Sequence, residues 1–158
     1  MREILFRAKA INRDSIDGRC RRTDYKNGDW VYGLITKPYN EKYDFPAEMR
    51  NTDGVTGIEV DYKTIGQYTG IGTYSNFTDE PIKLFEGDIC TLTDFDINGK
   101  DKLLTGVIEE KYGSLVFKAL SNEATLPLYF IDIESDLEII GNIYDNPELI
   151  GGEEDENG

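Results

Sequence analysis

The chain has 158 residues and a formal net charge of −14 at pH 7, from 17 basic and 31 acidic side chains, and it contains no histidine. This length allows one domain with its own core, and two cysteines are too few for a disulfide framework or a structural zinc site. The apolar runs are far shorter than the roughly 20 residues of a transmembrane helix, and the start lacks the pattern of a secretory signal. We therefore predict a cytoplasmic protein with no membrane partner.

The charge is unevenly distributed along the sequence. Residues 1–26 contain eight basic and four acidic side chains, a local charge of +4, which leaves −18 for the remainder. A surface this acidic repels nucleic acid and anionic lipid and attracts basic partners. Any nucleic-acid contact would have to use the N-terminal segment.

The first elements predict a β-hairpin. Apolar residues alternate with polar ones within 3–11, which is typical of a half-buried strand. Asn27-Gly28 is a turn signal and precedes the apolar run 30–35, which predicts a second strand.

The next segment is predicted to be a long irregular connection. Residues 37–57 contain two prolines and show no sustained period, apart from one potential helical turn at 46–50. Residues 58–60 then predict a short strand. Asp61 is an N-cap residue type that opens a brief turn before Ile65, and residues 66–71 are extended.

The second half predicts a series of short strands with tight turns. The predicted strands cover residues 84–85, 89–92, 103–110, 115–119, 126–133 and 137–143. We expect a mainly β protein with little helix, organised as one domain over 1–150. Its lobe 1–80 contains the irregular connection, its lobe 81–150 forms a small SH3-like barrel, and the glycine-rich and acidic tail 151–158 is disordered.

Several ordered pieces of the sequence resemble the YopX family of phage and prophage proteins from Gram-positive bacteria. The pieces are Phe6-Arg7-Ala8, Gly28-Asp29-Trp30-Val31-Tyr32-Gly33, Ile65-Gly66-Gln67-Tyr68-Thr69-Gly70, Phe85-Glu86-Gly87-Asp88-Ile89 and the run 139–149. The resemblance implies no assigned activity and no catalytic residues. It marks eleven motif positions, to which we assign structural roles: Gly66, Gln67, Tyr68, Thr69, Gly70, Glu86, Gly87, Asp88, Gly141, Asn142 and Tyr144.

The sequence departs from the family pattern at two places. Tyr62 follows Asp61 where relatives usually have a proline, so the turn is less rigid than the pattern suggests. Between Gly70 and Phe85, relatives tend to have a lysine- and glycine-rich turn, which this chain lacks. A ligand of that loop need not be shared with the relatives.

No catalytic constellation is evident. The absence of histidine removes the commonest general base and metal ligand. Cys90 shares strand parity with Leu92 and is predicted to be a core thiol, whereas Cys20 lies among arginines and lacks a base. Glu86 and Asp88 are better explained as acceptors of backbone hydrogen bonds around a turn at Gly87 than as a catalytic pair. We predict a non-enzyme without cofactor.

The run Asp94-Phe95-Asp96-Ile97-Asn98-Gly99 matches only the start of an EF-hand loop. Position twelve is Thr105 instead of glutamate, and the flanks are predicted strands. A hairpin turn at Asn98-Gly99 explains the same residues, so we predict no metal site.

Two features could contact partners. The arginines Arg19, Arg21 and Arg22 could bind phosphates, although the overall charge favours a solvated edge. Aromatic residues are concentrated in the first lobe, where they could either cover the core or form an interface. These candidate interface residues are Trp30, Tyr32, Tyr39, Tyr43 and Phe45.

The sequence therefore favours a non-catalytic phage accessory protein that acts by binding, with self-association through β-edges and the aromatic lobe. One alternative is an acidic decoy that mimics nucleic acid and occupies a basic host protein. Another is weak nucleic-acid binding through the basic N-terminal segment, which the total charge disfavours.

Overall fold

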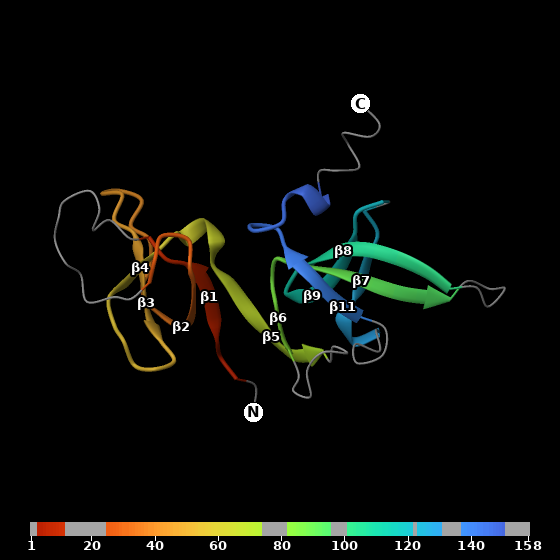
Figure 1. Ribbon diagram of the computed structural model, residues 1–158, viewed down its shortest axis with the longest axis horizontal. Coiled ribbons are helices and arrows are strands. Elements are labelled where there is room, and N and C mark those ends of the chain that lie inside the picture. The colour runs from red at the N-terminus through yellow and green to blue at the C-terminus, as the bar shows by residue number, and fades with distance from the viewer. Residues whose placement is uncertain are drawn as a thin grey trace. The chain divides into compact units, whose positions relative to one another are not determined.

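Antiparallel strands make up most of the regular structure in the computed structural model (Figure 1). The structure describes residues 3–11, 25–73, 82–95, 101–121, 123–130 and 137–150. The contacts divide the chain into two units, Met1–Tyr68 (unit 1) and Thr69–Gly158 (unit 2). The prediction of a mainly β protein is confirmed. No helix in the described ranges has the length and apolar character needed to cross a membrane.

Unit 1 contains a sheet in which neighbouring strands run antiparallel. Its strands lie in the order β4-β3-β2-β1-β5. Their bounds are β1 Phe6–Lys9, β2 Trp30–Lys37, β3 Ala47–Asn51, β4 Ile58–Val60 and β5 Gly66–Thr73, with the 3-10 helix η1 at Tyr62–Thr64 between β4 and β5. The last residues of β5 belong to unit 2.

The predicted first hairpin is confirmed. Strands β1 and β2 pair with Lys9 opposite Trp30. The turn before β2 places Gly28 at a φ of 93°, and the Gly28 N–H donates to the Ala10 carbonyl at 2.8 Å. The Asp29 carboxylate accepts from the Lys26 N–H at 2.8 Å. The turn therefore fixes the register in which β2 presents its side chains.

The irregular connection predicted over 37–57 is wrong in part, because Ala47–Asn51 forms β3 instead of a helical turn. Ala, Glu, Met and Arg are good helix formers, which explains the expectation. The segment forms a strand because it pairs with β2 and β4, which buries Ala47 and Met49 on one side and leaves Arg50 exposed. Pro46 precedes the strand, where a missing N–H breaks no ladder bond.

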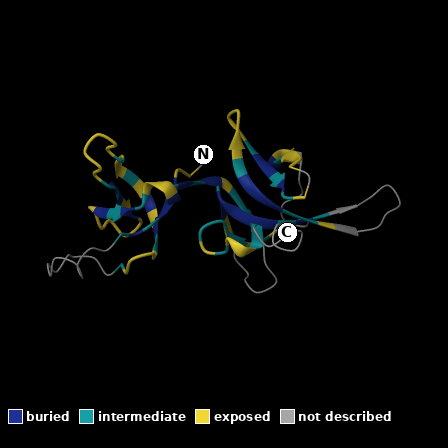
Figure 2. Cartoon of the chain, turned by 90° about the horizontal axis from the view of Figure 1, so that it is seen from above, coloured by how far each residue is buried: buried dark blue, intermediate teal, exposed yellow. Residues whose placement is uncertain are grey.

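The core of unit 1 lies on one face of this sheet. Buried and more exposed residues alternate along β3 and β4 and in the first half of β2, whereas in β1 both Arg7 and Ala8 are buried. The inward residues of these strands are fully or almost fully buried, as the dark blue segments of Figure 2 show. These residues are Ala8, Ala10, Val31, Ala47, Met49, Ile58 and Val60. Burial of each larger aliphatic side chain stabilises the unit by about 1.5–3 kcal/mol.

The predicted cap at Asp61 is also confirmed. Its carboxylate accepts from the Lys63 N–H at 3.0 Å, which starts η1. The Thr64 hydroxyl donates to the Asp61 carbonyl at 2.7 Å and accepts from the Lys9 N–H at 2.8 Å. These bonds hold η1 against the end of β1.

Unit 2 contains a five-stranded sheet in the order β10-β9-β8-β7-β11. The bounds are β6 Ile82–Phe85, β7 Asp88–Phe95, β8 Asp101–Lys111, β9 Ser114–Ala119, β10 Thr125–Pro127, the 3-10 helix η2 Leu128–Phe130, and β11 Leu137–Asn142. The second half of β5 neighbours β6. A separate core forms around Leu84, Cys90, Ile108 and Phe117, so the prediction of a core thiol at Cys90 is confirmed.

Two details of the second half differ from the expectation. The SH3-like barrel is not confirmed, since neither sheet closes in the described part of the chain. The strand predicted at 126–133 is short, because Pro127 ends the ladder and η2 follows. Residues 131–133, the predicted turn at 98–99, Cys20 and the tail 151–158 lie outside the described residues.

Candidate partner-binding site

The family-type motifs of unit 2 meet around one turn. Gly87, at a φ of 89°, connects β6 to β7; its N–H donates to the Ile108 carbonyl, and its carbonyl accepts from the Ile143 N–H, both at 2.9 Å. A Cβ at Gly87 would touch the Tyr144 ring at 3.4 Å. Two motif pieces that are far apart in the sequence are thus in contact.

Asp88 and Asn142, which are opposite each other in the register of β7 and β11, bind the backbone around this turn. The Asp88 carboxylate is buried and accepts from the Phe85 N–H at 2.8 Å. The Asn142 side-chain oxygen accepts from the N–H groups of Tyr144 and Asp145 at 3.0 and 2.9 Å. A Cβ on Gly141 would come within 2.5 Å of the Asn146 side chain. These are contacts of a folded turn: the Asp88 carboxylate and the Asn142 side-chain oxygen accept from backbone, and the Asn142 side-chain NH2 group donates to the Asp145 carboxylate at 3.1 Å.

The Gly-Gln-Tyr-Thr-Gly motif forms β5. Gly66 and Gln67 pair with β1 in unit 1, where Tyr68 is buried. In unit 2, the Thr69 hydroxyl donates to the Leu84 carbonyl at 2.8 Å and accepts from the Ile71 N–H at 3.1 Å. Gly70 has a φ of 85°. The motif residues on each side of the unit boundary therefore hold β5 in its sheet.

The net charge of the protein is distributed unequally between the two units. Residues 1–68 contain 12 basic and 11 acidic side chains, a net charge of +1, and residues 69–158 contain 5 and 20, a net charge of −15. The two values sum to the total of −14. Acidity is thus a property of unit 2, and the aromatic residues predicted to form an interface lie in the nearly neutral unit 1.

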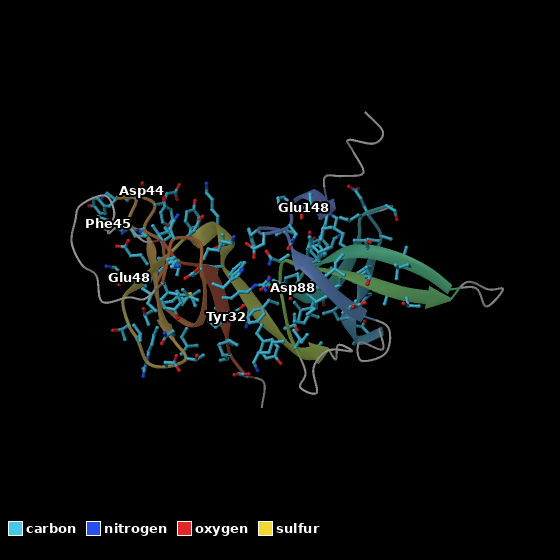
Figure 3. All side chains as sticks on the ribbon, viewed as in Figure 1. Tyr32, Asp44, Phe45, Glu48, Asp88 and Glu148 are labelled. Atoms are coloured by element: carbon cyan, nitrogen blue, oxygen red, sulfur yellow. The ribbon has the colours of Figure 1, made fainter. Side chains whose placement is uncertain are left out.

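The five predicted interface aromatics do not form one patch. Trp30 and Tyr32 lie on the outer face of β2, and the Trp30 ring has the Arg7 guanidinium 4.7 Å and the Lys9 ammonium 5.4 Å from its centroid. Figure 3 shows Tyr32 apart from Asp44 and Phe45 within unit 1. The other three aromatics lie on the loop between β2 and β3, residues 38–46, which we name the aromatic loop.

The aromatic loop presents a pair of exposed rings. Tyr43 and Phe45 are 59% and 54% exposed, and their ring centroids are 5.8 Å apart. The Lys42 ammonium lies 5.2 Å from the Tyr43 centroid. Exposed neighbouring aromatics are characteristic of interface anchors.

Internal hydrogen bonds fix the aromatic loop. Asn40 and Phe45 exchange two backbone hydrogen bonds of 3.0 and 3.1 Å, and the Asn40 side chain accepts from the Tyr43 N–H at 3.2 Å. Asp44 has a φ of 53° and accepts from the Tyr39 hydroxyl at 2.7 Å. The two exposed rings therefore sit on a loop with a defined conformation.

A pocket of about 290 Å³ lies at the base of the aromatic loop, entirely within unit 1. The rings of Tyr39 and Tyr62 stack in its wall, with centroids 3.9 Å apart and planes 8° from parallel. The remaining lining residues are Ile11, Asp44, Pro46, Val60, Asp61 and Lys63. The pocket thus combines an aromatic wall with two carboxylates and one ammonium group.

The surroundings of Tyr39 are electrostatically negative. The hydrogen bond to Asp44, followed by desolvation and by the charges of Asp44 and Glu41, raises the pKa of Tyr39 to about 12. The hydroxyl stays protonated at neutral pH and donates to a charged carboxylate. The raised pKa means that this hydrogen bond contributes its full stability below pH 10 and loses it as the pH rises towards 12.

We expect Asp44→Asn to lower the pKa of Tyr39 towards its ordinary value of 10.0. Asparagine keeps an acceptor oxygen and tolerates the positive φ, so the substitution removes the charge and leaves the loop conformation. NMR of the Tyr39 ring carbons, assigned with Tyr39→Phe, should show more ionisation at pH 10 in Asp44→Asn than in the unmodified protein. Equal ionisation in both would contradict the proposed role of Asp44.

Of the eight residues that line this pocket, sequence reasoning identified only Tyr39, and it missed the four other polar or aromatic ones: Asp44, Asp61, Tyr62 and Lys63. Tyr62 was the most recognisable of the four in the sequence, because relatives usually have a proline at this position. In the structure its ring stacks on Tyr39. Asp61 was identified only as a cap.

The arginines Arg19, Arg21 and Arg22, predicted as phosphate contacts, lie outside the described residues. In the described ranges, no group of three or more metal-ligating side chains comes together.

The fold and these contacts define a two-unit antiparallel β protein whose motif residues bind its own backbone. A family model described as YopX protein matches residues 19–151, so the chain belongs to the YopX family. No curated protein and no solved structure matches the chain.

Proposed function

We propose that the chain is a phage or prophage accessory protein that acts inside the bacterial host cell by binding a basic protein, without catalysis. The observation that carries this proposal is the exposed pair Tyr43 and Phe45 on the hydrogen-bonded aromatic loop. A preformed loop with rigid aromatic side chains loses little conformational entropy on binding, so its apolar contacts contribute fully to affinity.

The charge separation supports a basic partner. Unit 2 has a net charge of −15, which attracts a cationic protein over a long range and raises its association rate at low salt. The aromatic loop adds the short-range contact that charge alone cannot provide. Membership of the YopX family supports the phage context.

Self-association through sheet edges has less support. The five-stranded sheet of unit 2 ends at β10, which is three residues long and contains Pro127, and at β11, whose pairing has a bulge between Ile139 and Gly141. Short, proline-containing and bulged edges oppose pairing with another chain. Two copies of a protein with charge −14 also repel each other.

The test compares capture of host proteins by three tagged variants. We expect the unmodified protein to recover a basic host protein and the double variant Tyr43→Ala, Phe45→Ala to lose it. Tyr112→Ala is the matched control, because Tyr112 is 98% exposed in unit 2 and also has a lysine, Lys111, beside its ring at 5.9 Å. It should retain the partner.

Binding of the recovered protein, once purified, should be weakened at least tenfold by the double substitution and reduced by added salt. Three results would overturn the proposal: recovery that is equal for all three variants, recovery of acidic proteins only, or a sedimentation mass that rises with concentration while no host protein is recovered. The last result would instead favour a homo-oligomer.

A further inference from the structure

We propose that the pocket at the base of the aromatic loop receives an arginine side chain of the partner protein. This inference rests on the proposed function, because the pocket is lined by Asp44 and Pro46, the two neighbours of Phe45, whose ring would contact the same partner. It names the chemical group that the site selects: a planar guanidinium.

The size of the pocket fits one side chain. Its volume of about 290 Å³ is at the lower end of the range of ligand pockets, which begins near 300 Å³. All its lining residues belong to unit 1, so the site is complete without unit 2.

The aromatic wall favours a flat cation. Tyr39 and Tyr62 stack face to face, so each ring keeps one face outside the stack. The Lys63 ammonium already lies over the Tyr62 ring, although at 6.0 Å, the limit of a cation–π contact. A guanidinium stacks on a tyrosine ring more closely than an ammonium does, because it is planar and more weakly hydrated.

The two carboxylates supply the hydrogen-bond acceptors. Asp44 uses one oxygen for the Tyr39 hydroxyl, and Asp61 uses one oxygen for the Lys63 N–H. A carboxylate can accept further hydrogen bonds at its second oxygen, and guanidinium–carboxylate pairs are among the strongest hydrogen-bonded contacts in proteins. Both carboxylates are held in place by the bonds that they already make.

The negative charge around the pocket also favours a cationic ligand. The side chains that raise the pKa of Tyr39 include the charges of Asp44 and Glu41, and Asp61 adds a third carboxylate to the region. Among the residues that line the pocket, the carboxylates of Asp44 and Asp61 outnumber the single ammonium of Lys63, and Glu41 is followed on the loop by Lys42, which offsets its charge. The pocket is therefore negative overall, although unit 1 as a whole carries +1.

The probe for the test is the blocked tripeptide acetyl-Gly-Arg-Gly-amide, with the citrulline peptide as a neutral isostere. In NMR titrations we expect the arginine peptide to shift the ring signals of Tyr39 and Tyr62 saturably and the citrulline peptide to shift them little. Asp44→Asn should weaken binding of the arginine peptide about tenfold, because it keeps an acceptor oxygen but removes the negative charge that strengthens a guanidinium–carboxylate hydrogen bond. Asp53→Asn, which removes an exposed carboxylate away from the pocket, should leave binding unchanged.

Tyr62→Ala provides a second variant that removes the stack without changing the charge. It should also weaken binding of the arginine peptide, and retained dispersion of the unit 1 amide signals shows that the variant is folded. Equal shifts by the arginine and citrulline peptides, or unchanged affinity in Asp44→Asn, would overturn the pocket proposal.

Partner capture separates the two proposals. If Asp44→Asn retains the host partner at full affinity while the Tyr43→Ala, Phe45→Ala variant loses it, the pocket proposal is wrong and the proposed function stands. If both variants retain the partner, the proposed function is wrong. If both lose it and the arginine peptide binds as described, both proposals are supported.

Discussion

Replacing Gly33 with alanine is expected to destabilise unit 1 strongly. Gly33 is at the centre of β2, opposite Phe6 of β1 and Asn51 of β3. An added Cβ would overlap the Arg50 carbonyl oxygen and lie 2.8 Å from the Asn51 Cα. These are backbone atoms of the paired strand, so β2 and β3 would have to separate.

The expected loss is at least about 3 kcal/mol, the upper part of the usual range for overpacking, which is a large share of the stability of a small unit. Trp30 is the only tryptophan and lies in β2, so its fluorescence during urea unfolding reports on unit 1. Gly28→Ala is the control, because a Cβ there meets nothing within 4 Å and only the φ of 93° opposes it. It should lose about 1–2 kcal/mol. Similar midpoints for the two variants would show that β2 and β3 can adjust.

Local turn and cap chemistry made several elements predictable. Asn27-Gly28 fixed the first hairpin and Asp61 fixed η1, because both act through hydrogen bonds within a few residues. The strand β3 was missed because Ala47 to Arg50 have helical propensity, and only pairing with β2 and β4 overrides it. The barrel was expected from strand count, yet strand order and closure depend on contacts between distant residues that local pattern does not encode.

The candidate site was predictable only in part for the same reason. The concentration of aromatics identified Tyr39, Tyr43 and Phe45, but composition could not separate them from Trp30 and Tyr32 on the outer face of β2. The pocket joins the aromatic loop to η1, more than 15 residues further along the chain. Tyr39 and Tyr62 stack only because the fold brings the two segments together. The one indication in the sequence was a tyrosine after Asp61, where relatives usually have a proline.

The family-type motif residues and the candidate binding site are different residues, so the binding residues can change within the family while the motif stays the same. The motif residues Gly87, Asp88 and Asn142 bind backbone in unit 2, and Thr69 does the same beside β6. The aromatic loop and its pocket lie in unit 1 and use none of the motif positions. A shared scaffold can therefore present different binding residues, and Tyr62 is one place where this chain differs from the pattern that it resembles.

Asp88→Ala is expected to destabilise unit 2 by about 2 kcal/mol or more. The carboxylate is 2% exposed and accepts from the N–H of Phe85, which is also 2% exposed. Removing the acceptor takes away this buried hydrogen bond, a loss of about 1–3 kcal/mol, and adds a cavity. Hydrogen exchange of the β7 and β8 amides should accelerate, while Trp30 fluorescence still reports a folded unit 1.

Glu86→Ala separates this structural role from a catalytic one. Glu86 is the other acid of the same turn and is only partly buried, so its removal should change the stability of unit 2 by less than about 1 kcal/mol. A catalytic pair would behave differently, because catalytic carboxylates can be removed while the fold is retained, and both substitutions would then leave stability nearly unchanged. A large loss for Asp88→Ala beside a small one for Glu86→Ala places the Glu-Gly-Asp motif in the scaffold of unit 2, where Asp88 closes the turn between β6 and β7.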